Sequence, residues 1–186
     1  MSNWKKSSVE NIKELFDVSV NSEWTFSGAR STEVLTHGYH RYPAKFIPQL
    51  VRKLMETYAK NQEDTIADVF AGCGTTLVEA KVHGRKSVGV DINPVAELIT
   101  KAKITPLAPI EAQQQFEILT EEISSFNSEV NYAKDIHERI DYWFKPEEKN
   151  KIAFLYEITL RIADENLRNF FLCALSNILK NCSRWL

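Results

Sequence analysis

The stretch from Asp68 to Thr76, which reads Asp-Val-Phe-Ala-Gly-Cys-Gly-Thr-Thr, most restricts the folds open to this chain. A short and mostly apolar segment, residues 65–70, leads into two closely spaced glycines. Residues 75–82 then read as a helix, and Gly84 stands where a helix C-cap is expected. The pattern predicts a strand, a tight turn and a helix, in that order.

A second strand and a second helix follow at close spacing. Residues 87–90 form an apolar run, and Pro94 opens a helical segment that continues to about Ala102. Strand, helix, strand and helix at this spacing predict a βαβ unit with parallel strands.

The part before this unit carries weaker patterns. Residues 8–16 suggest a short helix, and residues 22–47 read as a loop with at most one short strand. Pro48 fits the first turn of a helix, where its missing N–H costs nothing. The apolar residues that follow it recur at helical spacing: Leu50, Val51, Leu54, Met55 and Tyr58.

The rest of the chain is predicted to be helical. One amphipathic helix is marked by Ala112, Phe116, Leu119 and Ile123. Two more helices are predicted over residues 146–163 and 164–180. We therefore expect an α/β fold with a helical C-terminal segment. Residues 1–109 would form the α/β part, and residues 110–186 a helical linker or interaction element.

The last predicted helix has an apolar stripe on one face. Its members are Leu167, Phe170, Phe171, Ala174, Leu175, Ile178 and Leu179. This stripe is a candidate docking surface for a partner, and burial against its own domain is the alternative.

Composition and charge set broad limits. The 186 residues suffice for one sizeable domain, and the net charge of −2 provides no global basic field. Residues 1–60 hold nine Lys/Arg and six Asp/Glu, which fits either an anionic partner or an ordinary solvated surface. Three cysteines without CxxC spacing argue against a disulfide framework or a zinc site. No signal-peptide or membrane-span run is present, so we expect a reduced, cytoplasmic protein.

The turn after the first strand has the features of a ligand site. Gly72 and Gly74 lack a Cβ, so a ligand can approach the main chain closely. Thr75 and Thr76 stand at the start of a helix, where anions and carboxylates are favoured. A tight strand-to-helix turn without any ligand is the alternative.

An acidic residue ends the second strand. Asp91 is well placed there to accept hydrogen bonds from ribose hydroxyls. Alone, such a residue is most often a helix N-cap or a turn residue. Asn93, directly before Pro94, can fill the capping role instead and leave Asp91 for a ligand.

Two common nucleotide-binding patterns do not fit. The dinucleotide fingerprint GxGxxG requires a third glycine where this chain has Leu77. A P-loop requires Gly-Lys-Ser/Thr after the turn, and that sequence is absent.

Three segments in the same order resemble the cofactor motifs of DNA methyltransferases that modify the exocyclic amino group of adenine (N6) or cytosine (N4). They are Asp68–Thr76, Gly89–Pro94 and the upstream segment His37–Pro48. The resemblance covers about residues 37–103. It implies a partial Rossmann-like fold of the S-adenosylmethionine-dependent methyltransferases, S-adenosylmethionine as the cofactor and double-stranded DNA as the substrate.

The resemblance also implies a role for each matching residue. Asp91 would accept both ribose hydroxyls, Ile92 would pack on the adenine ring, and Asn93 would lie beside it. The residues expected near the methionine moiety are Tyr42, Pro43, Ala44 and Lys45. The residues expected to form the turn beneath methionine and ribose are Asp68, Phe70, Ala71, Gly72, Cys73 and Gly74, with Thr75 and Thr76 near the carboxylate.

Some of these residues have simpler interpretations. Tyr42 and Phe46 could equally pack in the core. His37 and His40 are spaced like a pair of metal ligands, but two histidines without further ligands are more often structural. We therefore predict no metal site.

The resemblance lacks one part. In that family an Asp/Asn/Ser-Pro-Pro-aromatic loop accepts hydrogen bonds from the target amine and stacks on a flipped base. None of the six prolines here are adjacent, so no catalytic residue is predicted. The motif would come from a second polypeptide or from a missing C-terminal part. A methyltransferase acting on RNA, protein or a small molecule remains open, as does a non-catalytic cofactor-binding module.

Overall fold

The computed structural model describes residues 21–26, 28, 31, 33–43 and 45–184. The chain divides into two units, residues 1–30 and residues 31–186, and each is described by itself. In the first unit, the 3₁₀ helix η1 (Ser22–Trp24) is capped by the side chain of Asn21. The second unit is mostly helical and contains a small parallel sheet of two strands.

The elements of the second unit follow one another in a simple order. They are the 3₁₀ helix η2 (Leu35–Gly38), α2 (Pro48–Tyr58), β1 (Ile66–Asp68), α3 (Thr75–Val82), β2 (Ser87–Gly89), α4 (Pro94–Ile104), α5 (Pro109–Ile123), the 3₁₀ helix η3 (Glu138–Tyr142), α6 (Pro146–Leu160) and α7 (Glu165–Cys182).

The predicted βαβ unit is confirmed. Strands β1 and β2 run parallel, with Ile66 opposite Ser87 and Asp68 opposite Gly89, and α3 connects them. Both strands are shorter than the sequence predicts. Backbone hydrogen bonds continue past their ends, because Val90 N–H donates to the Asp68 carbonyl at 2.9 Å. The bonding thus extends into the turn that the sequence singled out.

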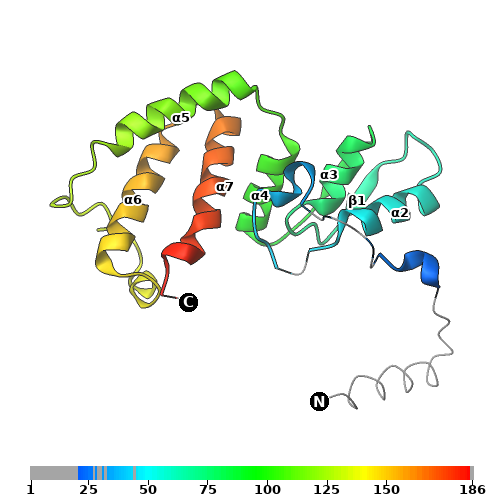
Figure 1. The fold of residues 1–186 in the computed structure, drawn as a ribbon, viewed down its shortest axis with the longest axis horizontal. Helices are drawn as coiled ribbons and strands as arrows, with labels where there is room; N and C mark the ends of the chain where they lie inside the picture. The colour runs from blue at the N-terminus through cyan, green and yellow to red at the C-terminus, as the bar shows by residue number, and fades with distance from the viewer. Residues whose placement is uncertain (1–20, 27, 29–30, 32, 44, 185–186) are drawn as a thin grey trace, which may run out of the picture. The chain divides into compact units, whose positions relative to one another are not determined.

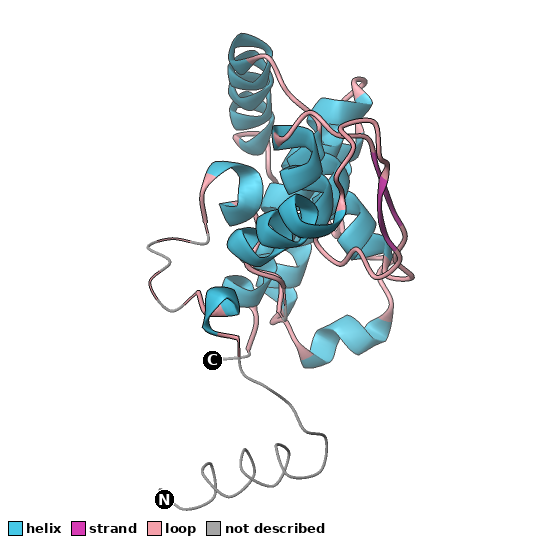
Figure 2. Cartoon of the chain, turned by 90° about the vertical axis from the view of Figure 1, so that its right-hand side faces the viewer, coloured by secondary structure: helices cyan, strands magenta, loops and turns pink. Residues whose placement is uncertain are grey.

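One face of this strand pair is covered and the other is exposed. Ile66 packs against a small core of Val51, Met55 and Ala80, contributed by α2 and α3. By contrast, Val69 is 65% exposed and Val88 56% exposed. Figure 2 shows the two strands at one margin, with the helices to one side of them.

The upstream part differs in detail from the expectation. Pro48 occupies the first turn of α2, as predicted, and the helix buries Val51 and Met55. The described residues between 22 and 47 form loops and two 3₁₀ helices and contain no strand. The predicted helix over residues 8–16 lies outside the described residues.

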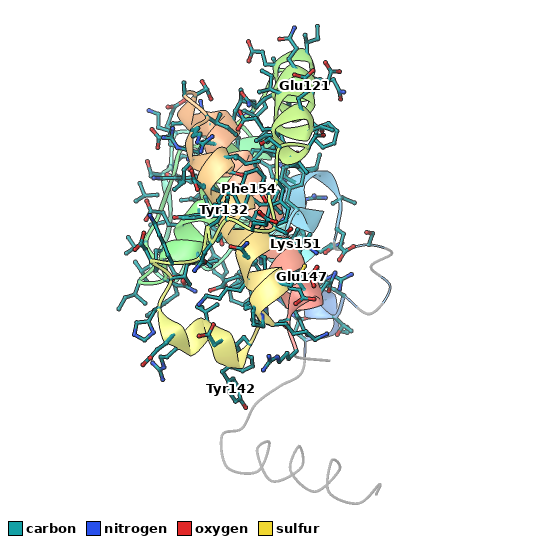
Figure 3. All side chains as sticks on the ribbon, turned by 90° about the vertical axis from the view of Figure 1, so that its left-hand side faces the viewer. Glu121, Tyr132, Tyr142, Glu147, Lys151 and Phe154 are labelled. Carbon is teal, nitrogen blue, oxygen red and sulfur yellow. The ribbon has the colours of Figure 1, made fainter. Side chains whose placement is uncertain are left out.

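The C-terminal segment is helical, as predicted. Helices α6 and α7 lie side by side, with α4 on the other side of α7 (Figure 1). The rings of Tyr132 and Phe154 pack with centroids 4.8 Å apart (Figure 3). Around them is a core cluster that consists of Leu119, Phe154, Ile158 and Ile162, with Phe126, Tyr132, Leu155, Leu167 and Phe171 packed against it.

The apolar stripe of α7 is mostly used within this unit. Leu167 and Phe171 join the core cluster, and Phe170 makes ring contacts with Phe171 and with Tyr39. Ala174 and Ile178 remain exposed. Packing against its own unit, one of the two interpretations of the stripe, therefore accounts for Leu167, Phe170 and Phe171. Leu175 and Leu179 are half-buried.

Two further observations concern the whole set of described residues. None of the helices among them is long and apolar enough to cross a membrane. Cys73, Cys173 and Cys182 are free thiols, and the first two are buried. The boundary at residue 109 between an α/β part and a helical segment stays a prediction.

Candidate functional site

The turn between β1 and α3 contains two glycines in the left-handed region, Gly72 at φ +52° and Gly74 at φ +77°. A Cβ at Gly74 would lie 2.7 Å from the side chain of Thr100. Glycine at this position therefore allows α4 to pack closely on the turn, a reason different from ligand approach. At Gly72 the nearest atom to an added Cβ is Cε1 of Tyr42, at 3.5 Å. A side chain at position 72 would therefore lie against the ring of Tyr42.

Asp68 stabilises the first half of the turn. Its Oδ1 accepts a hydrogen bond from the Phe70 N–H at 3.1 Å, and its Oδ2 accepts one from the Thr76 hydroxyl at 2.6 Å. The Ala71 N–H donates to the Val90 carbonyl at 2.9 Å. The hydroxyl of Thr76, predicted near a ligand carboxylate, thus has a partner inside the protein.

Asp91 joins the turn to the end of β2. Its Oδ2 accepts from the Gly72 N–H and its Oδ1 from the Asn93 N–H, both at 2.8 Å. The Asn93 side chain in turn accepts from the Val95 N–H at 3.0 Å and caps α4. The predicted capping role of Asn93 is therefore confirmed. Asp91 is half-buried, and its two carboxylate oxygens have further acceptor sites beyond these two bonds.

Tyr42 lies between the turn and the helical core. The side-chain N–H of Asn93 donates to the Tyr42 hydroxyl at 3.5 Å, and the ring packs against a cluster that includes Cys73 and Cys173. Both interpretations of Tyr42, a site residue and a core residue, are therefore consistent with its position. Phe46 is 57% exposed, so its core interpretation is not supported.

The neighbours of Tyr42 are arranged differently. Pro43 is exposed, and Lys45 is half-buried with its Nζ donating to the His37 carbonyl at 3.2 Å. Ala44 lies outside the described residues. Tyr42 is therefore the residue of this segment that lies against the turn. The ammonium of Lys45 instead bonds the main chain of its own segment.

Two large apolar side chains beside the turn are almost fully exposed. Phe70, directly after β1, is 87% exposed, and Ile92, after β2, is fully exposed. Among the described residues, neither side chain belongs to a hydrophobic core cluster. In contrast, the side chains of Cys73 and Thr75 are only 2% and 4% exposed, so they lie in the interior of the unit.

A buried polar group beneath this region was not found by sequence reasoning. Glu79 on α3 is fully buried and accepts from His37 Nε2 at 2.9 Å and from the Arg52 guanidinium at 3.2 Å. Burial lowers the pKa of His37, although the hydrogen bond to Glu79 opposes this shift. The carboxylate thus ties η2 and α2 to α3. The only sequence signal is an acidic residue within the apolar run Leu77–Ala80.

A second buried charge was also missed. Lys103 is 4% exposed, and its Nζ donates to the carbonyl of Cys73 at 3.1 Å. Burial lowers the pKa of this ammonium. His40 is bonded to Ser176 at 3.2 Å. Among the described residues, no group of three or more His, Cys, Asp and Glu side chains could hold a metal ion.

The turn and Asp91 lie at the carboxyl ends of two parallel strands, and sequence comparison identifies the family of the chain. Residues 1–102 match the family model described as DNA methylase, of the N6/N4 type. The chain belongs to the N6/N4 DNA methylase family. The resemblance drawn from the three motifs is therefore confirmed.

Three type II methyltransferases are similar to this chain. M.MvaI of Kocuria varians is 34% identical over 161 residues, which cover 82% of this chain and 36% of that protein. M.MjaII of Methanocaldococcus jannaschii is 46% identical over 68 residues, and M.BsoBI of Geobacillus stearothermophilus is 39% identical over 67 residues. Those matches cover 13% of each relative. The chain thus spans about a third of M.MvaI and less of the others. No solved structure matches it.

Proposed function

We propose that this chain is the S-adenosylmethionine-binding portion or subunit of a site-specific DNA methyltransferase that modifies an exocyclic amino group of adenine or cytosine. The observation that carries the proposal is the cluster of Tyr42, Gly72, Asp91 and Asn93 at the carboxyl ends of β1 and β2. We further propose that the βαβ unit is part of a Rossmann-like sheet, in which ligands bind at that edge.

The residues beside Asp91 suit the adenosyl part of the cofactor. Each carboxylate oxygen accepts one backbone N–H, which leaves acceptor capacity for two ribose hydroxyls. The exposed side chain of Ile92 offers an apolar surface for an adenine ring, with Asn93 beside it. The exposed ring of Phe70 offers a second apolar surface at the neighbouring strand end.

The turn suits the methionine part. We propose that residues 70–76 contact it mainly through the main chain, since Cys73 and Thr75 have buried side chains. Tyr42, Pro43, Ala44 and Lys45 would close over it from the upstream segment. When bound, S-adenosylmethionine supplies an electrophilic methyl group on its sulfonium. This chain's residues bind and orient that donor.

Methyl transfer requires residues that this sequence lacks. With no two prolines adjacent, the Pro-Pro-aromatic loop of the family is absent. We propose that a second polypeptide, or a part of the protein outside this sequence, supplies it and holds the flipped base. Double-stranded DNA would be the substrate of that assembly.

Cofactor binding is tested by isothermal titration of S-adenosylmethionine into the chain. We expect Asp91→Ala to weaken binding about 10- to 100-fold, the range for lost hydrogen bonds to a charged group. Asp64→Ala is the matched control, because among the described residues the Asp64 carboxylate accepts only the Asn61 N–H, in the loop before β1. No binding by the unmodified chain, or equal effects of both substitutions, would contradict the proposal.

The substrate is tested with a chimera in which this chain replaces the matching part of M.MvaI. Transfer of a labelled methyl group into duplex DNA, followed by nucleoside analysis, would distinguish N6-methyladenine from N4-methylcytosine. Transfer into RNA or protein but not into DNA would contradict the proposed substrate.

A further inference from the structure

A cleft of about 740 Å³ lies beside Tyr42. Its walls come from the segment of residues 33–45, from the residues that follow η3, and from the end of α7. The residues that line it are Glu33, Arg41, Tyr42, Pro43, Lys45, Trp143, Phe144, Leu179, Lys180 and Ser183. The cleft therefore adjoins the proposed cofactor site through three shared residues, Tyr42, Pro43 and Lys45.

Hydrogen bonds fix the walls of the cleft relative to one another. The Arg41 N–H donates to the side chain of Asn177 on α7 at 3.1 Å, and His40 bonds Ser176 at 3.2 Å. On the other side, the Arg184 N–H donates to the Trp143 carbonyl at 2.7 Å. The end of α7 and the residues directly after it thus connect both walls through hydrogen bonds.

The rim of the cleft is basic. Arg41 and Lys180 are exposed and Lys45 is half-buried, whereas Glu33 is the single carboxylate among the lining residues. Within the part of the chain that the structure describes, none of these three cations forms an ion pair with a carboxylate. A local excess of two positive charges on a chain of net charge −2 favours an anionic ligand.

The floor of the cleft is aromatic and apolar. Tyr42 and Phe144 are half-buried and line it together with Pro43 and Leu179. Bases of an unpaired strand stack on such aromatic rings while cations along a groove hold the phosphates. In a duplex the faces of the bases are covered by their neighbours, so an aromatic floor favours nucleotides that have left the stack.

We propose that this cleft binds unpaired nucleotides of a DNA strand, with the bases on Tyr42 and Phe144 and the phosphates at Arg41 and Lys180. The identity of the nucleic acid rests on the proposed function. The cleft itself rests on the charges and rings named above. It would hold the opened strand next to the methyl donor.

The charges are tested by fluorescence anisotropy of a labelled DNA oligonucleotide, single-stranded or paired with its complement, added to the full chain. We expect the single strand to bind more tightly. The double substitution Arg41→Glu with Lys180→Glu should lower its affinity at least about tenfold and make the log–log salt slope shallower by about 1.4, two phosphate contacts at about 0.7 each. The control, Lys60→Glu with Lys134→Glu, changes the net charge equally at exposed positions outside the cleft and should have little effect.

The ring is tested by Phe144→Leu, which keeps an apolar side chain and should reduce the preference for single strands. Equal losses in the charge variant and its control, tighter duplex binding, or no oligonucleotide binding would overturn the cleft proposal. The last result would favour a protein segment as the occupant. Titration of S-adenosylmethionine into the same variants separates the two proposals. Cofactor binding without DNA binding would contradict only the proposal that the cleft binds DNA. DNA binding without cofactor binding would contradict only the proposed function.

Discussion

The turn region, residues 68–72 and 90–95, and the core of the helical region, residues 109–182, use their large apolar side chains in opposite ways. In the turn region Phe70 and Ile92 point to solvent, and backbone hydrogen bonds to Asp68 and Asp91 hold the chain in place. In the helical region aromatic and aliphatic side chains pack on one another, and their rings are 4.8–5.7 Å apart.

This difference indicates a division of labour. A segment that stabilises the fold buries its apolar surface, because that burial is the main favourable contribution to folding. A segment that binds an apolar ligand has to keep such surface accessible until the ligand arrives. We therefore expect substitutions in the helical region to change stability, and substitutions of the exposed residues in the turn region to change ligand affinity.

The largest effect is expected from the helical core. Phe154→Ala removes a ring that is 5% exposed and should lower the free energy of unfolding by about 3–5 kcal/mol. Tyr156→Ala is the control on the same helix, because Tyr156 is half exposed and should cost much less. Denaturant unfolding measures both, and similar losses would contradict the assigned core.

The next effect concerns the glycine at the start of α3. Gly74→Ala combines a left-handed φ with a 2.7 Å clash against Thr100 and should destabilise by about 2–3 kcal/mol. Gly84→Ala is matched in φ, at +66°, but its nearest neighbour is 3.6 Å away. It should cost only about 1–2 kcal/mol. If both variants unfold at the same denaturant concentration, the packing role of Gly74 is wrong.

A substitution of the exposed Ile92 tests cofactor affinity separately from stability. Ile92→Ala should leave the free energy of unfolding within about 0.5 kcal/mol, because the residue is fully exposed. It should weaken S-adenosylmethionine binding several-fold, through the lost apolar contact. Ile110→Ala, at an exposed position of α5, should change neither property. A loss of stability without a loss of affinity would contradict the proposed role of Ile92 in cofactor binding.

The smallest effect is a dependence of stability on pH. Burial lowers the pKa of His37 below its ordinary value of 6.5, so the unfolded chain binds a proton more readily than the folded one. Stability should therefore be complete above pH 6.5 and decline as the pH falls below it. His37→Gln should flatten that decline between pH 7.5 and 5.5 in thermal unfolding. An unchanged slope would show that His37 does not contribute.

The sequence predicted those features that depend on neighbouring residues. The turn, the first-turn prolines and the cap at Asn93 are local, since each requires only the residues next to it. The family motifs assigned Tyr42 and Asn93 to one ligand, and the two side chains share a hydrogen bond. The strands are shorter than the apolar runs around them because residues 69–71 turn away after Asp68.

The features that sequence reasoning missed depend on contacts between distant residues. The hydrogen bond of Glu79 to His37 spans 42 positions, and Lys103 reaches the carbonyl of Cys73 across 30 positions. Neither partner is indicated by spacing or composition.

Hydrogen–deuterium exchange with and without S-adenosylmethionine tests the central claim most directly. Bound cofactor should slow exchange at residues 70–76 and 90–95, where the Gly72 and Asn93 amides bond Asp91. Exchange in α6 should stay unchanged. Protection concentrated in α6 and α7, with none at the turn, would contradict the assignment of Asp68–Thr76 and Asp91 as the cofactor site.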